Sequence, residues 1–548
     1  MSKTNAAVWY AQDGFDPVAK GINGRRVAGE SFLKGFLRHA DVDEFVLALH
    51  GGDDALAPVR DLAQVLRPGV PVRRVGLIQP ETIAPVSTYF YPSPNFSAEA
   101  WRRAPYGTQA WSICGITHTT STAAVMQGFF DLRMAPVKPW DAVICTSKSV
   151  LASVNHMMDL SDDHMRHHLR ADPPARPMLP VIPLGVHCND FAPDAAAGAG
   201  LRARLGAAPQ DVVFATIARL TPHEKFDPLP TYLAMQAAQA QLPDRKLHVV
   251  FCGQFREDYS RKVFEEGAKS LMPDVGFALL DGGNAAERKA ALSGADVFMF
   301  LIDNIQETFG LAPLEGMASG LPLLVSDWDG LKDTVPAEVG FRVTSRSLPG
   351  LYLAQEALRY QGGTDNYLQY CAATSAMTEI DQDELMSRIL TLARDGDLRR
   401  RMGQAALAHV RTHYDWSVVV PQMQALWAEQ EVMRAAAPRQ RYRADALPIA
   451  PSPSNYFASY PTEQVTLQNQ RFVAVLGGPD LQTLLRIRNY IATKRMFASA
   501  EQIGAVLATV QASGGCDLAA IEAACGLKTR QAARVVIWLL KYNLLRRA

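Results

Sequence analysis

The sequence predicts an α/β protein with two tandem Rossmann-like domains and a small α-helical or winged-helix C-terminal domain. Apolar runs of strand length alternate with helix-like stretches. The runs are continuously apolar, as expected for parallel strands that helices cover on both faces. The pattern breaks at a Pro-, Gly- and Ala-rich stretch near 183–200 and then restarts. A chain of 548 residues, 48% of them hydrophobic, is long enough for about three compact units.

The two Rossmann-like domains are predicted over residues 1–190 and 191–432. The apolar runs that predict strands in the first domain are 6–11, 44–51, 73–79, 111–119 and 141–149. Those of the second domain are 211–220, 247–255, 275–283, 295–302 and 321–328. Open α/β sheets bind ligands at the carboxyl ends of their strands, so two such domains predict a ligand cleft between them. Functional residues are therefore expected in loops that follow strands.

The C-terminal part is predicted to contain a linker at 433–470 and a winged-helix-like domain at 471–548. The linker is rich in Pro, Ser and Ala, and "AIEAACGLKTRQAARVVIWLL" has the helix, glycine turn and helix of a helix-turn-helix. Residues 471–548 hold 11 Lys and Arg against 4 Asp and Glu, a local charge of +7 that leaves −7 on residues 1–470. This basic module favours an anionic or protein partner.

Nucleic-acid binding by this module is not favoured over a stabilising, oligomerising or protein-binding role. A recognition helix presents several polar side chains to the bases. Here only Thr529, Arg530, Gln531 and Arg534 precede an apolar run. A protein partner through residues 471–548 and a homo-oligomer are both compatible with the pattern.

The cysteines and apolar runs predict a cytoplasmic protein. The seven cysteines are scattered without C-x-x-C spacing, which argues against disulfides and against a zinc site. The N-terminal stretch has no apolar run typical of a signal peptide, and later runs are far shorter than the roughly 18 residues of a membrane span. Peripheral membrane association is left open.

The stretch "ETFGLAPLEGMASGLPLLVSDWDG", residues 307–330, carries two acidic residues eight positions apart. Gly310 and Pro313 would interrupt a helix through Glu307, so a loop followed by a helix is predicted. Proline favours a first helical turn and glycine the position past a helix end, which predicts a short helix between Pro313 and Gly320. Glu315 then lies near the start of that helix.

The chemistry of this stretch suits a ligand with both phosphate and hydroxyl groups. The backbone N–H groups of Gly310 and Leu311 lie at a helix N-terminus, where phosphate binds well. The carboxylates of Glu307 and Glu315 accept hydrogen bonds, so their natural partners are hydroxyl groups. A nucleotide sugar carries both kinds of group.

This stretch resembles the Glu, seven residues, Glu signature of retaining glycosyltransferases of the GT-B fold, a family that includes sucrose-synthase-like and mannosyltransferase-like enzymes. Further landmarks occur in the order of that family: "VIPLGVHCNDF", "IARLTPHEKF" and "DLRRRMGQAALAHVRTHYDW". The resemblance covers roughly residues 5–430, and the ordered set is more specific than any single motif.

The resemblance implies a role for each acidic and basic site residue. Glu315 would hold the ribose hydroxyls of the nucleotide and Glu307 hydroxyls of the donor sugar. Arg219 and Lys225 would neutralise the diphosphate leaving group in place of a divalent metal, so neither a metal nor another cofactor is expected. The Arg-to-Lys spacing is six positions instead of the usual five, which predicts a displaced Lys225 if the loop does not absorb the extra residue.

The resemblance also implies roles near the donor sugar and the diphosphate. His118 would face the donor sugar, and Gly21 and Gly24 would form the glycine loop that passes close to the diphosphate. Phe309, Gly310 and Leu311 would belong to the donor site. The plain alternatives are a hydrogen-bonded histidine at a strand end, ordinary turn glycines and, for Arg219 and Lys225, ordinary surface cations.

The leading interpretation is a retaining, metal-independent glycosyltransferase that uses a nucleotide-sugar donor and front-face attack. The acceptor, whether glycan, lipid or protein, cannot be read from the sequence, nor can the nucleotide base or the sugar. The insertion-like segment 346–380 either shapes the acceptor side or pads the domain. The rival interpretation is a nucleotide-sugar-sensing protein with a DNA- or protein-binding module, and a GT-B epimerase is less favoured.

Overall fold

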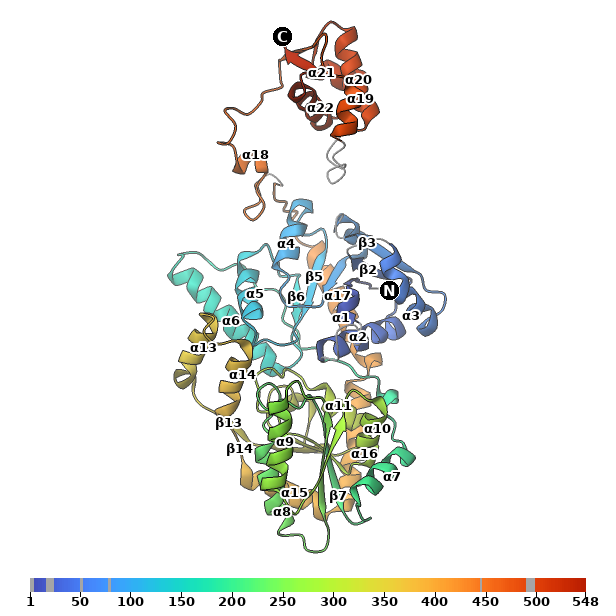
Figure 1. Ribbon diagram of the computed structural model, residues 1–548, viewed down its shortest axis with the longest axis vertical. Helices are drawn as coiled ribbons and strands as arrows, with labels where there is room; N and C mark the ends of the chain where they lie inside the picture. Colours follow the sequence, from blue (N-terminus) through green and yellow to red (C-terminus); the bar gives the residue numbers. More distant parts are fainter. Residues whose placement is uncertain (1–3, 16–23, 50–52, 77–79, 444–445, 489–497) are drawn as a thin grey trace. The chain divides into compact units, whose positions relative to one another are not determined.

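Each of the two Rossmann-like domains contains a six-stranded, fully parallel sheet (Figure 1). The computed structural model describes residues 4–15, 24–49, 53–76, 80–443, 446–488 and 498–548. The first sheet has the strand order β3-β2-β1-β4-β5-β6 and the second the order β12-β11-β10-β7-β8-β9. Numbered within its own domain, each sheet follows the order 3-2-1-4-5-6 of dinucleotide-binding Rossmann folds. The predicted fold class is confirmed for both domains.

In the first domain, helices alternate with the strands as the sequence pattern predicts. The strands are β1 (Ala7–Trp9), β2 (Phe45–Leu49), β3 (Val72–Gly76), β4 (Thr88–Tyr91), β5 (Ser112–Ile116) and β6 (Ala142–Ile144). The α-helices are α1 (Gln12–Phe15), α2 (Gly24–His39), α3 (Ala57–Leu66), α4 (Ser97–Arg103), α5 (Ala123–Met134) and α6 (Lys148–His167), with short 3₁₀ turns at Asp53–Leu56, Pro80–Val86 and Ala104–Tyr106.

The second domain repeats this alternation and adds a separate segment after its last strand. Its strands are β7 (Val212–Ile217), β8 (Leu247–Gly253), β9 (Gly276–Asp281), β10 (Val297–Phe300), β11 (Leu323–Ser326) and β12 (Gly340–Val343). Its helices are η4 (Cys188–Phe191), α7 (Ala195–Leu205), α8 (Leu229–Gln239), α9 (Asp258–Leu271), α10 (Ala285–Gly294), α11 (Leu311–Ala318), α12 (Leu331–Thr334), α15 (Gln382–Arg394) and α16 (Gly396–His413). Helix α17 (Trp416–Ala435) follows α16 in the chain. The added segment contains β13 (Ser345–Ser347), η5 (Gly350–Leu353), α13 (Ala354–Gln361), α14 (Tyr367–Ala376) and β14 (Thr378–Ile380).

One strand in each of the two six-stranded sheets was not predicted from the sequence. Strand β4 is only four residues long and lies between Pro85 and Pro92, so its short aromatic run resembles a loop in sequence. Strand β12 is buried only at its ends, Gly340 and Val343, and exposes Arg342, because it is the edge of the second sheet. Both strands are parallel to their neighbours, which completes the two six-stranded sheets.

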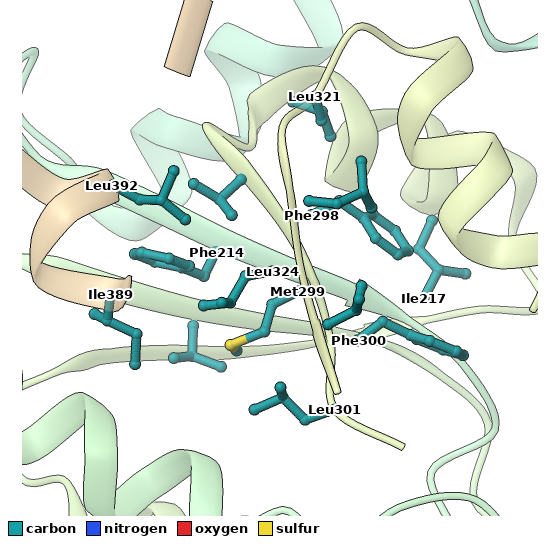
Figure 2. Close-up of a cluster of buried hydrophobic side chains, with 14 of the residues drawn as sticks. Phe214, Ile217, Phe298, Met299, Phe300, Leu301, Leu321, Leu324, Ile389 and Leu392 are labelled. Atoms are coloured by element: carbon teal, nitrogen blue, oxygen red, sulfur yellow. The ribbon is translucent and has the colours of Figure 1, made fainter. Parts of the chain in front are cut away.

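The four central strands of the second sheet are buried on both faces, as their continuous apolar runs predict. Figure 2 shows Phe214, Met299 and Leu324 from three neighbouring strands beside Ile389 and Leu392 of α15. Phe298 lies on the opposite face, because successive side chains of a strand alternate. The apolar core places the ends of β7 and β10, and the loops that follow them, in fixed positions.

Helix α17 packs in the core of the first domain although the prediction placed it with residues 191–432. Its Trp416 and Trp427 are buried among Phe32, Phe36 and Phe90 of the first domain. The side chain of the fully buried Gln430 donates hydrogen bonds to the carbonyls of Ile113 at 3.1 Å and Trp140 at 3.0 Å. The apolar face of α17 thus packs on α2 and the first sheet, so residues 416–435 form part of the first domain.

Residues 444–548 form a second compact unit. It contains α18 (Pro453–Tyr456), β15 (Arg471–Ala474), α19 (Leu481–Ile487), α20 (Ala500–Ala512), β16 (Cys516–Asp517), α21 (Leu518–Cys525), α22 (Thr529–Lys541) and β17 (Leu545–Arg547). The antiparallel sheet β16-β15-β17 and helices α20 to α22 share one apolar core. The expected helix, glycine turn and helix are present, with Gly526 at φ +63°. The winged-helix assignment stays a prediction.

The cysteines are free thiols, as their scattered spacing predicts. All seven cysteines are free, and six of them are buried. Within the described ranges, every helix is too short or too polar to traverse a lipid bilayer.

Candidate functional site

The candidate site is built on two loops that follow β7 and β10 of the second domain. Asn304, which is fully buried, holds these loops together. Its side-chain amide donates to the carbonyl of His223 at 2.8 Å and accepts from the backbone N–H of Gln306 at 3.0 Å. The backbone carbonyl of Asn304 accepts a hydrogen bond from the indole N–H of Trp328 at 3.1 Å. The loop that contains Glu307 is therefore fixed against the loop that contains Lys225.

Glu307 and Lys225 form an ion pair at the centre of this arrangement. The Lys225 ammonium donates to Oε2 of Glu307, and Oε1 accepts from the backbone N–H of Gly310 at 3.1 Å. Burial raises the pKa of Glu307, but the charge of Lys225 and the hydrogen bonds from Lys225 and Gly310 outweigh it and lower the pKa. Glu307 is thus ionised and able to accept hydrogen bonds from ligand hydroxyls.

The extra residue between Arg219 and Lys225 does not displace Lys225 from Glu307. The turn at 222–225 absorbs it, and the N–H of Lys225 donates to the carbonyl of Thr221 at 3.0 Å. The Lys225 ammonium also lies 5.2 Å from the ring centre of Phe300, the last residue of β10.

Arg219 is held beside this pair by two acceptors. Its guanidinium donates to Glu224 at 2.9 Å and to the side-chain oxygen of Gln306. Glu224 also accepts from Arg256 at 2.7 Å. Burial and the neighbouring Arg256 lower the pKa of Arg219. Three cations, Arg219, Lys225 and Arg256, thus face two carboxylates, Glu224 and Glu307, so the cluster has one positive charge in excess.

Glu315 lies in a different electrostatic environment from Glu307. It is half-buried on α11, which begins after Gly310 as the loop-then-helix prediction requires. Burial raises the pKa of Glu315 to about 7, and the charge of Arg288 on α10 opposes the shift. Gly310 has φ +86°, a conformation that glycine adopts without strain.

The other predicted site residues include His118, Phe309 and Leu311, which lie in different environments. His118 follows β5, its carbonyl accepts from the hydroxyl of Thr308, and the residue lines a small apolar pocket with Phe90 and Trp416. Phe309 is 2% exposed in the core of the second domain, so only its backbone can face a donor. Leu311 is half-buried against the same core.

Gly21 and Gly24 are the two glycines predicted in the loop near the diphosphate. Gly24 is the first residue of α2. Gly21 lies outside the described residues.

Several site residues carry no motif and were missed in the sequence. Glu224 and Gln306 orient Arg219, and Tyr367 of α14 contacts Gln306. Asp329 accepts from Ser147 of the first domain at 3.1 Å, and burial raises its pKa to about 7. Only the position of Glu224, directly before Lys225, offered a sequence signal.

The architecture and the site together define a GT-B fold, in which two Rossmann-like domains face each other and the second carries a cationic cluster at its strand ends. Residues 200–348 match the model for the family "Glycosyl transferases group 1". The chain is 26% identical over 325 residues to D-inositol 3-phosphate glycosyltransferase from Corynebacterium glutamicum, an alignment that covers 58% of this chain and 67% of the relative. The enzyme of the same name from Corynebacterium efficiens is 24% identical over 326 residues, covering 58% and 66%.

Similarity to a solved structure supports the same fold. The structure of Anabaena HepE in complex with UDP has a TM-score of 0.50 and 14% sequence identity, covering 78% of this chain and all of that chain. The similarity extends beyond residues 200–348 and supports the fold of the first domain too. At 14% identity it does not indicate the substrate.

Substitution of Glu315 by glutamine is expected to change stability in a pH-dependent way. The pKa of Glu315 in the folded protein is about 7, above its ordinary 4.5. The protonated side chain therefore contributes to the free energy of unfolding in full below pH 4.5, and this contribution is lost as the pH rises through 7. Glutamine resembles the protonated form at every pH. Glu315→Gln should therefore melt close to wild type near pH 5 and above wild type near pH 8, as thermal unfolding of both proteins would measure. A constant difference across this range would contradict the raised pKa.

Proposed function

We propose that this chain is a retaining glycosyltransferase that moves a sugar from a nucleotide-diphosphate donor to a hydroxyl acceptor without a metal ion. The observation that carries the proposal is the cluster of Arg219, Lys225 and Glu307 at the carboxyl ends of β7 and β10. Parallel sheets bind their ligands at that edge. The family match over residues 200–348 supports glycosyl transfer, and the UDP complex of HepE is compatible with a nucleotide donor.

The charges of the cluster suit a diphosphate leaving group. A diphosphate recruits Lys225 and Arg219, because the cluster already carries one excess positive charge. Lys225 then turns from Glu307 toward the ligand, and Glu307 is free to accept hydrogen bonds from sugar hydroxyls. The cations act where negative charge grows as the bond to the leaving group breaks, which is the role a divalent metal would otherwise have.

The reaction is a single exchange of bonds at the anomeric carbon. The bond from this carbon to the diphosphate oxygen breaks, and a bond to the acceptor oxygen forms on the same face. The proton of the acceptor hydroxyl passes to the departing diphosphate oxygen. Glu315 would hold the ribose hydroxyls in its ionised form, and His118, which follows β5, would face the donor sugar from the first domain.

A panel of nucleotide sugars tests this proposal with a matched variant. The full chain is incubated with UDP- and GDP-linked hexoses, with and without EDTA, and release of the nucleoside diphosphate is measured. One donor should be turned over equally in EDTA, and Glu307→Gln, which keeps the size of the side chain, should reduce turnover about 100-fold or more. Product anomers resolved by NMR should match the donor configuration.

Three outcomes would contradict parts of the proposal. Turnover of no donor, together with no thermal stabilisation by any donor, would contradict glycosyl transfer. Loss of turnover in EDTA would contradict metal independence. An inverted anomer would contradict retention.

A further inference from the structure

The segment 345–380, which we call the bridge segment, is a rigid attachment to the second domain. Its strands β13 and β14 pair antiparallel, and the turn between α13 and α14 is fixed by a two-pronged ion pair between Arg359 and Asp365 at 2.7 and 2.9 Å. Tyr360 stacks on Tyr370 with ring centres 4.5 Å apart and planes 12° apart. The bridge segment therefore presents its aromatic side chains in defined positions.

The bridge segment reaches the first domain at the loop that follows β5. The hydroxyl of Tyr367 lies 2.9 Å from the Ser121 hydroxyl and 3.5 Å from that of Thr119. The hydroxyl of Tyr360 accepts from the backbone N–H of Ala123 at 2.9 Å. This loop also contains His118, and α5 begins at its end with Ala123.

Tyr367 differs from Tyr360 because it also contacts the candidate site. Its hydroxyl accepts from the side-chain amide of Gln306 at 3.3 Å, and the oxygen of the same amide accepts from Arg219. The phenol proton is then available to Ser121 or Thr119. Burial raises the pKa of Tyr367, which keeps that proton in place. A continuous series of hydrogen bonds thus joins Ser121, Tyr367, Gln306 and Arg219.

We propose that Tyr367 is a positioning residue that orients Arg219 through Gln306 only when the first domain lies against the second. The inference rests on the proposed glycosyl transfer, in which Arg219 neutralises the leaving group. Because Ser121 belongs to the first domain, its contact with Tyr367 forms only in this closed arrangement. Without that contact, the Tyr367 hydroxyl loses the first-domain partner that fixes its rotation, so its hydrogen bond to the Gln306 amide is less well oriented and Gln306 holds Arg219 less firmly. The fully oriented cation is thus reserved for the state in which both domains enclose the substrates.

Hydrogen exchange in the ligand-free full chain tests this positioning without any donor. Tyr367→Phe keeps the ring but removes the hydroxyl, so backbone amides at 304–310 should exchange about threefold to tenfold faster, as expected for loss of one neutral hydrogen bond. Tyr360→Phe is the matched control, since it removes a hydroxyl that contacts the same first-domain loop but not Gln306. It should accelerate exchange near 123 and leave 304–310 unchanged. Equal exchange at 304–310 in wild type and Tyr367→Phe overturns the proposal.

Steady-state kinetics with the donor that wild type uses gives the second readout. Tyr367→Phe should lower kcat about threefold to tenfold with a smaller change in donor KM, while Tyr360→Phe keeps the wild-type kcat. The effects of Tyr367→Phe and Gln306→Ala should not add in the double variant, because both interrupt the same series. Equal losses in the two tyrosine variants, or additive losses in the double variant, would overturn the inference. Failure of wild type to turn over any donor would instead overturn the proposed function and leave the exchange result standing.

Discussion

Replacing Arg219 with alanine is expected to lower kcat for sugar transfer about 10²- to 10³-fold, with a smaller effect on donor KM. The side chain of Arg219 is 25% exposed and is oriented by Glu224 and Gln306 before any ligand arrives. A cation held in advance costs no reorganisation when negative charge develops on the leaving diphosphate. Initial rates with the donor identified from the nucleotide-sugar panel measure the effect.

Two further variants make this prediction specific. Arg219→Lys keeps the charge but lacks the planar fork of donors that binds Glu224 and Gln306 in fixed directions, so its kcat should fall between wild type and Arg219→Ala. Arg261→Ala removes a 54% exposed arginine of the same domain that pairs with Glu265 at 3.1 Å, and it should retain wild-type activity. A kcat for Arg219→Ala within threefold of that of Arg261→Ala would exclude Arg219 from the chemistry.

The parts of the fold that follow from local chemistry could be predicted from the sequence. The loop at Glu307 and the short helix ending before Gly320 depend on glycine and proline, whose backbone preferences are intrinsic. The doubly buried strands follow from continuous apolar runs. Strand β4 could not be predicted in this way, because four residues between prolines carry too little pattern.

The parts that depend on distant contacts could not be predicted. Counting residues from Arg219 to Lys225 gives no information on the turn that absorbs the extra one. The return of α17 to the first sheet is decided by which apolar surface remains uncovered, as the burial of Trp427 shows. Gln306 and Tyr367 meet only because the bridge segment folds back over the site. The role of such polar residues depends on contacts between segments that are distant in the sequence.

The largest effect on stability is expected from Asp141→Ala in the first domain. Asp141 and Arg103 are both fully buried and share two hydrogen bonds of 2.6 and 2.7 Å. The Asp141 carboxylate also accepts from the backbone N–H groups of Ile113 and Lys138, at 2.9 and 2.8 Å. Its removal leaves a guanidinium buried without its counter-charge, which costs about 3–5 kcal/mol. Denaturant unfolding followed by tryptophan fluorescence would measure the loss, since Trp111 lies beside the pair.

Two control variants separate the cost of leaving Arg103 without a counter-charge from the stabilisation that the ion pair itself provides. Asp163 and Arg166 on α6 are 60% and 52% exposed, so Asp163→Ala should cost at most about 1 kcal/mol. The double variant Arg103→Met with Asp141→Leu removes both charges and fills similar space, so it should be less destabilised than Asp141→Ala. A double variant that is no more stable than Asp141→Ala would show that the backbone hydrogen bonds of the pair, and not the orphaned charge, dominate the loss, because the double variant leaves the N–H groups of Ile113 and Lys138 and the carbonyls of Trp111 and Pro136 without these partners.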